Sequence, residues 1–194
     1  MSAAQVLTPL PKVTPPPTDD DPLFEIIDGI RVEMQVSTNA LMIATRLSRF
    51  IGNHADQHDL GEVAVEVLFR LALPIDRIRR PDVAFVPYSE WPKGRPLPDD
   101  NGWTARPSLC VEVVSPTDRA EETREKVDEY LRAGVPTVWV VYPRQQIVDV
   151  YEAPNGVRYV RRDGELDGGA AVPGFRLKLT DLFPDPPADP PPAP

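Results

Sequence analysis

The sequence has little of what secreted or membrane proteins carry. Its one cysteine, Cys110, cannot form an internal disulfide, which fits a reducing compartment. The first residues lack the basic-then-apolar pattern of a secretory signal, and no apolar run approaches the length needed to span a bilayer. The two histidines, His54 and His58, have no third metal ligand nearby, so we interpret them as surface or capping residues. We expect a soluble cytoplasmic protein.

The chain also lacks an excess of positive charge. It has 21 lysines and arginines against 30 aspartates and glutamates, a formal net charge of -9. A protein that coats nucleic acid nonspecifically needs clustered cations to contact phosphates, so this class is disfavoured. A nuclease is not excluded, because part of the negative charge lies near the ends and an empty metal site adds more. The central segment still holds many arginines: Arg77, Arg79, Arg80, Arg95, Arg106, Arg119 and Arg124.

The 25 prolines are concentrated at the two ends of the chain. Residues 1–22 combine a proline cluster with an acidic run, and residues 184–194 are nearly all proline, aspartate and alanine. Neither end has a hydrophobic face to bury, so both are predicted to be disordered tails. The remaining residues, 23–183, are predicted to form one domain with a substantial core.

Two acidic residues in strand-like surroundings are the most informative feature. Asp82 and Glu112 each lie in a segment rich in β-branched and aromatic residues. A buried carboxylate is costly unless it is paired, protonated or bound to a cation. On neighbouring strands the two could converge on a hard divalent cation. Alternatively, and with equal weight, they are structural acids, with Asp82 paired to Arg79 or Arg80 and Glu112 paired to a buried lysine or arginine.

The pattern of elements predicts an α/β fold, in which the Asp82 and Glu112 strands are neighbours in one mixed sheet. A proline-rich loop, residues 87–106, separates these two strands, and loops of that length are often functional. The other predicted elements are a hairpin over 24–32 turning at Asp28-Gly29, a helix from Ser37 or Thr38 to about 52–54, a strand over 63–71, a helix over 118–133, and strands over 138–142, 147–151 and 157–160.

The helix predicted over 118–133 carries a candidate catalytic lysine. Asp118 and Glu121 have the spacing of a capping box at its start. Lys126 borders the apolar stripe of this helix, so its ammonium could turn back toward the strand carboxylates. The alternative, a surface ion pair between Glu122 and Lys126, has the greater weight from spacing alone.

Several ordered motifs together resemble the Uma-two family of proposed endonucleases. The resemblance extends over most of the predicted domain, from residues 24–29 to residues 166–175. It implies a fold of the PD-(D/E)xK nuclease superfamily, a restriction-endonuclease-like mixed sheet flanked by helices, here with an N-terminal hairpin and extra C-terminal strands. The motifs are Arg80-Pro81-Asp82-Val83, Glu112-Val113-Val114-Ser115-Pro116, the run from Glu125 to Val135 with Lys126, and Val138-Trp139-Val140-Val141.

The resemblance implies a magnesium- or manganese-dependent site. Asp82, Glu112 and the Val113 carbonyl would hold the ion, and Lys126 would orient a water or offset charge on the phosphate. The superfamily pattern has a lysine two residues after the second carboxylate, where this chain has Val114. The departure makes Lys126, on the following helix, the candidate for that role.

Four further residues have weaker signals. Glu25 or Glu66 could add a carboxylate for a second ion, but Glu66 alternates with apolar valines, which favours a solvent-facing position. Asn39 stands where the resemblance leads us to expect a histidine. Ser115 lacks a glycine-flanked turn and a histidine partner, so it is not interpreted as a nucleophile.

Two functions from different classes remain open. The first is an endonuclease acting on DNA, for which a basic cleft facing the carboxylates is expected. The second is a noncatalytic binding or assembly module that retains the nuclease fold. A homodimer is also expected, because residues 138–141 and 157–160 supply more apolar strand surface than a small domain easily hides.

Overall fold

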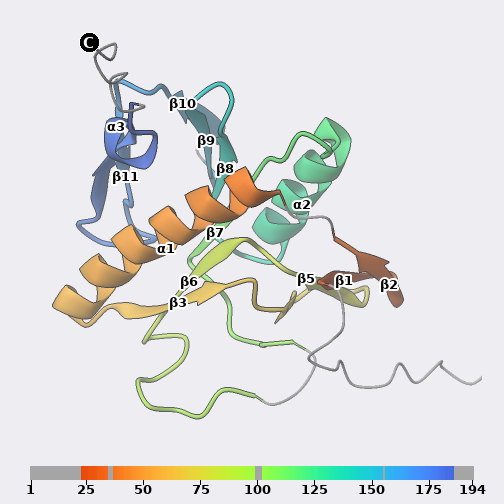
Figure 1. The fold of residues 1–194 in the computed structure, drawn as a ribbon. Helices are drawn as coiled ribbons and strands as arrows, with labels where there is room; N and C mark the ends of the chain where they lie inside the picture. The colour runs from red at the N-terminus through yellow and green to blue at the C-terminus, as the bar shows by residue number, and fades with distance from the viewer. Residues whose placement is uncertain (1–22, 35–36, 99–101, 155, 186–194) are drawn as a thin grey trace, which may run out of the picture.

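A six-stranded mixed sheet forms the centre of the protein (Figure 1). The computed structural model describes residues 23–34, 37–98, 102–154 and 156–185, so the predicted tails lie outside it except for residues 184 and 185. The strand order is β10-β9-β8-β7-β6-β3, with β7 and β8 parallel and the other neighbours antiparallel. The strands are β3 (Gly61–Val65), β6 (Val83–Pro87), β7 (Leu109–Val113), β8 (Thr137–Tyr142), β9 (Ile147–Glu152) and β10 (Gly156–Val160).

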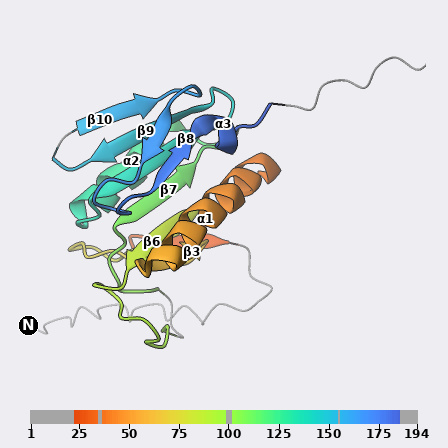
Figure 2. The ribbon, with the colours of Figure 1, turned by 90° about the vertical axis from the view of Figure 1, so that its left-hand side faces the viewer.

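Two apolar layers cover the two faces of this sheet, and the arrangement of the helices around it is seen in Figure 2. Helix α1 (Thr38–His58) covers one face, together with β11 (Glu165–Asp167), β12 (Arg176–Lys178) and α3 (Leu179–Leu182). Helix α2 (Ala120–Arg132) packs on the opposite face. Because side chains alternate along a strand, Val83 and Phe85 face α1, whereas Ala84 and Val86 face α2. The predicted mixed α/β fold is confirmed, with the Asp82 segment leading into β6 beside β7.

A smaller sheet with the order β2-β1-β5-β4 lies beside the central sheet. Its strands are β1 (Phe24–Ile27), β2 (Ile30–Glu33), β4 (Phe69–Arg70) and β5 (Arg77–Arg79). The hairpin predicted at Asp28-Gly29 is present: φ is 51° at Asp28 and 74° at Gly29. Two successive positive φ values are what a tight two-residue hairpin turn requires.

Both long helices differ from their predicted ends. Ser37 caps α1 as expected, but the helix continues past Gly52 to His58 and ends at Asp59, where φ is 53°. The buried Ala55 prolongs the apolar face of the helix beyond the glycine, and packing of that face outweighs the low helix propensity of glycine. Helix α2 begins at Ala120 without a side-chain cap, so the predicted capping box is wrong: Asp118 instead accepts the Ser115 N–H at 2.7 Å.

The single strand predicted over 63–71 is two strands in different sheets. Strand β3 ends at Val65, and Glu66 adopts a left-handed conformation with φ of 53° before the chain enters β4. The kink reverses the predicted orientation: Val65 and Val67 are exposed, whereas both carboxylate oxygens of Glu66 are buried. The expectation that Glu66 faces solvent is therefore wrong.

The two apolar strand segments on which the homodimer prediction rests differ in exposure. Residues 138–141 of β8 are fully buried inside the sheet, so their part of the argument is wrong. Strand β10 lies at the end of the sheet, and its Val157 and Tyr159 side chains are exposed. Among the residues that the structure describes, no helix is long and apolar enough to cross a membrane.

Candidate active site

Three carboxylates lie side by side at one end of the central sheet. Strand β6 pairs with β3 on one side and β7 on the other, and both ladders end at Val83. One residue beyond, Glu66, Asp82 and Glu112 occupy opposing positions on three neighbouring chain segments. The Glu66 N–H continues the pairing by donating to the Asp82 carbonyl at 3.3 Å. The alternation of side chains directs Asp82 and Glu112 to the face that α2 covers.

Helix α2 brings two donors to Glu112. The Tyr130 hydroxyl donates to Glu112 Oε1 at 2.7 Å, and Lys126 Nζ lies 3.1 Å from Glu112 Oε2. Lys126 also lies 3.1 Å from Glu25 Oε1. The structure thus places Lys126 at the strand carboxylates, as the functional interpretation expected, and its ion pairs there replace the predicted surface pair with Glu122.

Burial and mutual repulsion raise the pKa of two of these acids. Burial raises the pKa of Asp82 to about 7, and the charge of Glu66 adds to the rise. The Val113 N–H donates to Asp82 Oδ2 at 2.5 Å, and this hydrogen bond opposes the rise. Burial likewise raises the pKa of Glu112 to about 7, against the opposing charge of Lys126 and with a contribution from Asp82. Like charges directly opposite on neighbouring strands are destabilising. The cluster therefore favours uptake of a proton or a cation.

Glu66 is the acid of the row with the fewest partners. Its buried carboxylate oxygens lie beside the Asp82 carboxyl, with which they share a hydrogen bond when one of the two acids is protonated, and they have no other donor among the described residues. Burial raises the pKa of this carboxyl, and the charge of Arg80 opposes the rise. Buried polar atoms without a partner are rare and call for one. Carboxylate oxygens are the ligands that hard divalent cations prefer, so the donor set of Glu66, Asp82 and Glu112 fits magnesium or manganese.

The arrangement is not yet a closed set of metal ligands. Over the described ranges, no three His, Cys, Asp or Glu side chains are grouped so that they could hold a metal ion as they stand. Glu112 has Lys126 on one oxygen and Tyr130 on the other. Ion binding would therefore require Glu112 to exchange a contact.

A buried ion network extends from Lys126 into the smaller sheet. Glu25 Oε2 lies 2.8 Å from Arg79 Nη1, and Arg79 Nε donates to Glu129 Oε2 at 2.6 Å. Arg77 Nε is 2.8 Å from Glu129 Oε1. The predicted pairing of Asp82 with Arg79 or Arg80 is thus replaced by pairing of Arg79 with Glu25 and Glu129.

This network holds Lys126 in its charged form. Burial alone would raise the pKa of Glu25, but the charges of Lys126 and Arg79 outweigh it and lower that pKa. Burial would lower the pKa of Lys126, but Glu112 and Glu25 together raise it above its usual range. Glu25 is therefore ion-paired with Lys126 and Arg79, and this pairing suits it to position Lys126 better than to bind a second metal ion.

The cleft in front of these residues is acidic. It has a volume of about 710 Å³ and is lined by the hairpin, the start of α1, the end of β7 and the first half of α2. Its basic lining residues are Arg79, Arg119 and Lys126. They are outnumbered by the acidic ones: Glu25, Glu33, Asp82, Glu112, Asp118, Glu122 and Glu125. The basic cleft expected for a nuclease is not what the structure has.

The remaining residues singled out from the sequence lie outside the carboxylate row. Ser115 donates to Asp118 Oδ1 at 2.8 Å in the turn that follows β7. Asn39 is exposed in the first turn of α1. His54 and His58, near the other end of that helix, hydrogen-bond through ring nitrogens to carbonyl oxygens, of Pro173 at 2.9 Å and of His54 at 2.8 Å respectively.

Sequence reasoning missed the roles of Tyr130 and Glu129. Helical periodicity predicts that Tyr130 belongs to the apolar stripe of the helix and indicates no role for Glu129. The spacing of Lys126, Glu129 and Tyr130 at i, i+3 and i+4 was the available signal, because it places all three on one face of the helix.

The mixed α/β fold is that of a nuclease-like protein. A family model, Uma2, described as "Putative restriction endonuclease", matches residues 10–180, and the chain belongs to this family. The fold also resembles the crystal structure of "a putative nuclease belonging to DUF820 from Anabaena variabilis ATCC 29413", with a TM-score of 0.72 and 18% identity over 82% of this chain and 89% of that one. No curated protein matches the sequence.

Proposed function

We propose that this protein is a magnesium- or manganese-dependent endonuclease that hydrolyses phosphodiester bonds of DNA. The observation that carries the proposal is the row of Glu66, Asp82 and Glu112 with the Lys126 ammonium beside it. Membership of a family described as restriction endonucleases supports the reaction class. The buried oxygens of Glu66, which have no donor other than the Asp82 carboxyl among the described residues, support the dependence on a cation.

The site residues would have two roles, binding the metal ion and positioning the phosphate. Glu66, Asp82, Glu112 and the Val113 carbonyl would hold the divalent ion, which acts as a Lewis acid on the phosphate and lowers the pKa of a bound water. Lys126 stays protonated, so it serves as a hydrogen-bond donor to the attacking water or to a phosphate oxygen, and not as a general base.

The acidic cleft makes the dependence on a divalent ion strict. A DNA phosphate that approaches the cleft meets more carboxylates than cations. Phosphate binding requires positive charge, and a divalent ion bound at the carboxylates would supply it. Chelation should therefore weaken DNA binding as well as abolish cleavage.

The test is a cleavage assay on supercoiled plasmid and on single-stranded DNA. Wild-type protein should nick or cut in magnesium or manganese and should lose this activity in a chelator. The Glu112→Gln variant keeps the shape of the side chain and removes its charge, so it should be inactive while melting as a folded protein. Activity that persists in Glu112→Gln would contradict the proposal.

The second candidate is a noncatalytic binding or assembly module on the same fold. Two observations favour it: Lys126 and Tyr130 already satisfy both oxygens of Glu112, and the cleft is acidic. Wild-type protein that binds no divalent ion and cuts neither substrate would support this candidate.

A further inference from the structure

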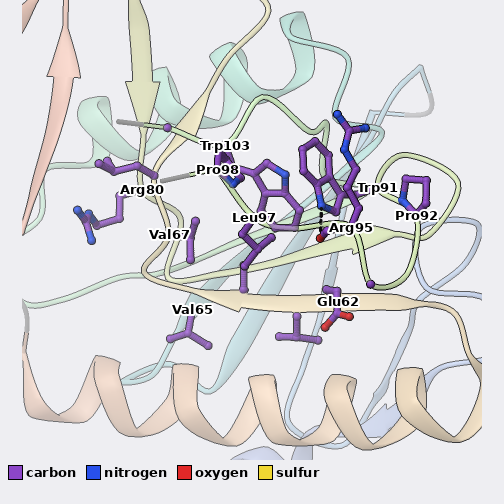
Figure 3. Close-up of a pocket in the computed structure, with 15 residues that line it drawn as sticks. Glu62, Val65, Val67, Arg80, Trp91, Pro92, Arg95, Leu97, Pro98 and Trp103 are labelled. Atoms are coloured by element: carbon purple, nitrogen blue, oxygen red, sulfur yellow. Dashed lines mark hydrogen bonds between the residues drawn. The ribbon is translucent and has the colours of Figure 1, made fainter. Parts of the chain in front are cut away.

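A second pocket lies beyond the carboxylate row, along the outer edge of β3 (Figure 3). Its volume is about 590 Å³, within the range of small-molecule binding sites. Strand β3 ends the sheet order, so its far edge forms one wall of the pocket. Figure 3 shows Arg80 on one side, Trp91 with Arg95 on the other, and Trp103 and Leu97 between them.

Aromatic rings and arginines meet in this pocket. The Arg95 guanidinium lies 3.8 Å from the centroid of the Trp91 ring, and the rings of Trp91 and Trp103 are edge-to-face at 5.5 Å. Trp103 stacks on Phe69 at 5.4 Å, which fixes the floor of the pocket. Trp103 is 4% exposed, and its Nε1–H donates to no residue that the structure describes.

The pocket is cationic, in contrast to the acidic cleft. Its ionisable lining residues are Arg80, Arg95 and Glu62. Arg80 donates to two carbonyl oxygens, of Phe24 at 3.1 Å and of Glu66 at 2.6 Å, and the Glu66 and Glu25 carboxylates partly offset its charge. Aromatic rings combined with two arginines are suited to a ligand that carries both a π-face and a phosphate.

The same chain segments build the pocket and the carboxylate row. Val65 and Val67 line the pocket, and Glu66 between them belongs to the row. Arg80, whose guanidinium contacts the Glu66 carbonyl, is two residues before Asp82. A ligand in the pocket therefore lies on the same strand end as the proposed site of hydrolysis.

We infer that this pocket binds the base of an unstacked nucleotide next to the scissile phosphate, an inference that rests on the proposed nuclease function. The base would contact Trp91 and Leu97, and Arg80 and Arg95 would contact the adjoining phosphates. A base paired inside a duplex cannot reach such a pocket without leaving the stack. The substrate class is thus single-stranded DNA, or duplex DNA with an extruded nucleotide.

The experiment separates recognition of the base from recognition of the backbone. Fluorescence anisotropy measures the Kd for a labelled single-stranded oligonucleotide and for a strand of equal length whose central nucleotides are abasic, with calcium as the hard cation. The quantity compared is the ratio of the two Kd values. Both strands carry the same phosphates, so the ratio reports the contribution of the bases.

Two variants and one matched control are compared with wild type. Trp91→Ala removes the ring, and Leu97→Asp introduces a charge at a wall residue that is 60% exposed and therefore tolerant of substitution. Tyr159→Ala is the control, because Tyr159 is also an exposed aromatic residue near an arginine, Arg161 at 5.3 Å, but lies on β10 at the opposite end of the sheet. Circular dichroism verifies that each variant is folded.

Base stacking on an aromatic side chain predicts that wild type and Tyr159→Ala bind the base-containing strand at least about fivefold more tightly than the abasic strand. In Trp91→Ala and Leu97→Asp that ratio should fall to about one. A ratio of one in wild type, or a ratio unchanged in both variants, would overturn the inference. If one of these two results is found and DNA cleavage in magnesium still requires Glu112, only the inference about the pocket is wrong. If wild-type protein neither binds nor cuts DNA, both the pocket inference and the proposed nuclease function are wrong.

Discussion

Replacing Asp82 with asparagine should make the ion-free protein more stable above neutral pH, although it removes a proposed metal ligand. The pKa of Asp82 in the folded protein is about 7, against a value of 3.8 for an unperturbed aspartate. The folded state therefore binds more protons than the unfolded state between these two values. Stability falls as the pH rises through that window, and the full cost is present above pH 7.

The size of the effect follows from the shift. A difference of about three pH units at about 1.4 kcal/mol each sets an upper bound of roughly 4 kcal/mol. Asparagine keeps an oxygen for the Val113 N–H and offers an amide donor to the Glu66 oxygens. We expect Asp82→Asn to gain about 2–4 kcal/mol at pH 8, or roughly 5–15 °C in Tm for a domain of this size.

The assay is thermal unfolding in a chelator at pH 5 and at pH 8. At pH 5 the folded Asp82 is largely protonated but an unfolded aspartate is already ionised, so the gain should fall to less than about half of its value at pH 8. Asp163→Asn, at an exposed turn position, is the control and should change stability by less than about 0.5 kcal/mol at either pH. An Asp82→Asn variant that melts below wild type at pH 8 without metal would refute the electrostatic reasoning.

Three further predictions concern the surroundings of the site. Lys126→Ala should abolish DNA cleavage but retain divalent-ion binding, because Lys126 acts on phosphate and water; parallel loss of both in calorimetry and cleavage assays would argue against this role. Glu129→Gln removes the charge that pairs with two buried arginines, so the free energy of unfolding measured by chemical denaturation should fall by about 3–5 kcal/mol. Glu125→Gln, at an exposed position, is the control and should lower it by less than about 0.5 kcal/mol. Light scattering should detect a homodimer, and a monomer at all accessible concentrations would rule this association out.

The strands of Asp82 and Glu112 were predictable from local patterns, whereas local spacing favoured a surface pair for Lys126 and only the family resemblance pointed it to the carboxylates. A carboxylate in an apolar strand has few satisfactory environments, and a lysine beside the apolar stripe of the next helix can reach one of them. The antiparallel register of β6 with β7 then brings Asp82 and Glu112 opposite each other.

Glu66 shows what a local pattern could not supply. Period-two alternation assigned it to solvent, but the left-handed backbone at this residue breaks the strand and buries its oxygens. A positive φ is uncommon at a glutamate, and no neighbouring residue type in the sequence indicates this conformation. The acidic character of the cleft and the network around Glu129 likewise depend on segments distant in sequence, which only the tertiary fold brings together.

Titration calorimetry with manganese and magnesium tests the central claim most directly, namely that Glu66, Asp82 and Glu112 form a divalent-ion site. Wild-type protein should give saturable binding that both Asp82→Asn and Glu112→Gln abolish while the fold is retained, because each substitution removes a charge that holds the ion. The absence of binding by folded wild-type protein, or equal binding by both variants, would contradict the account.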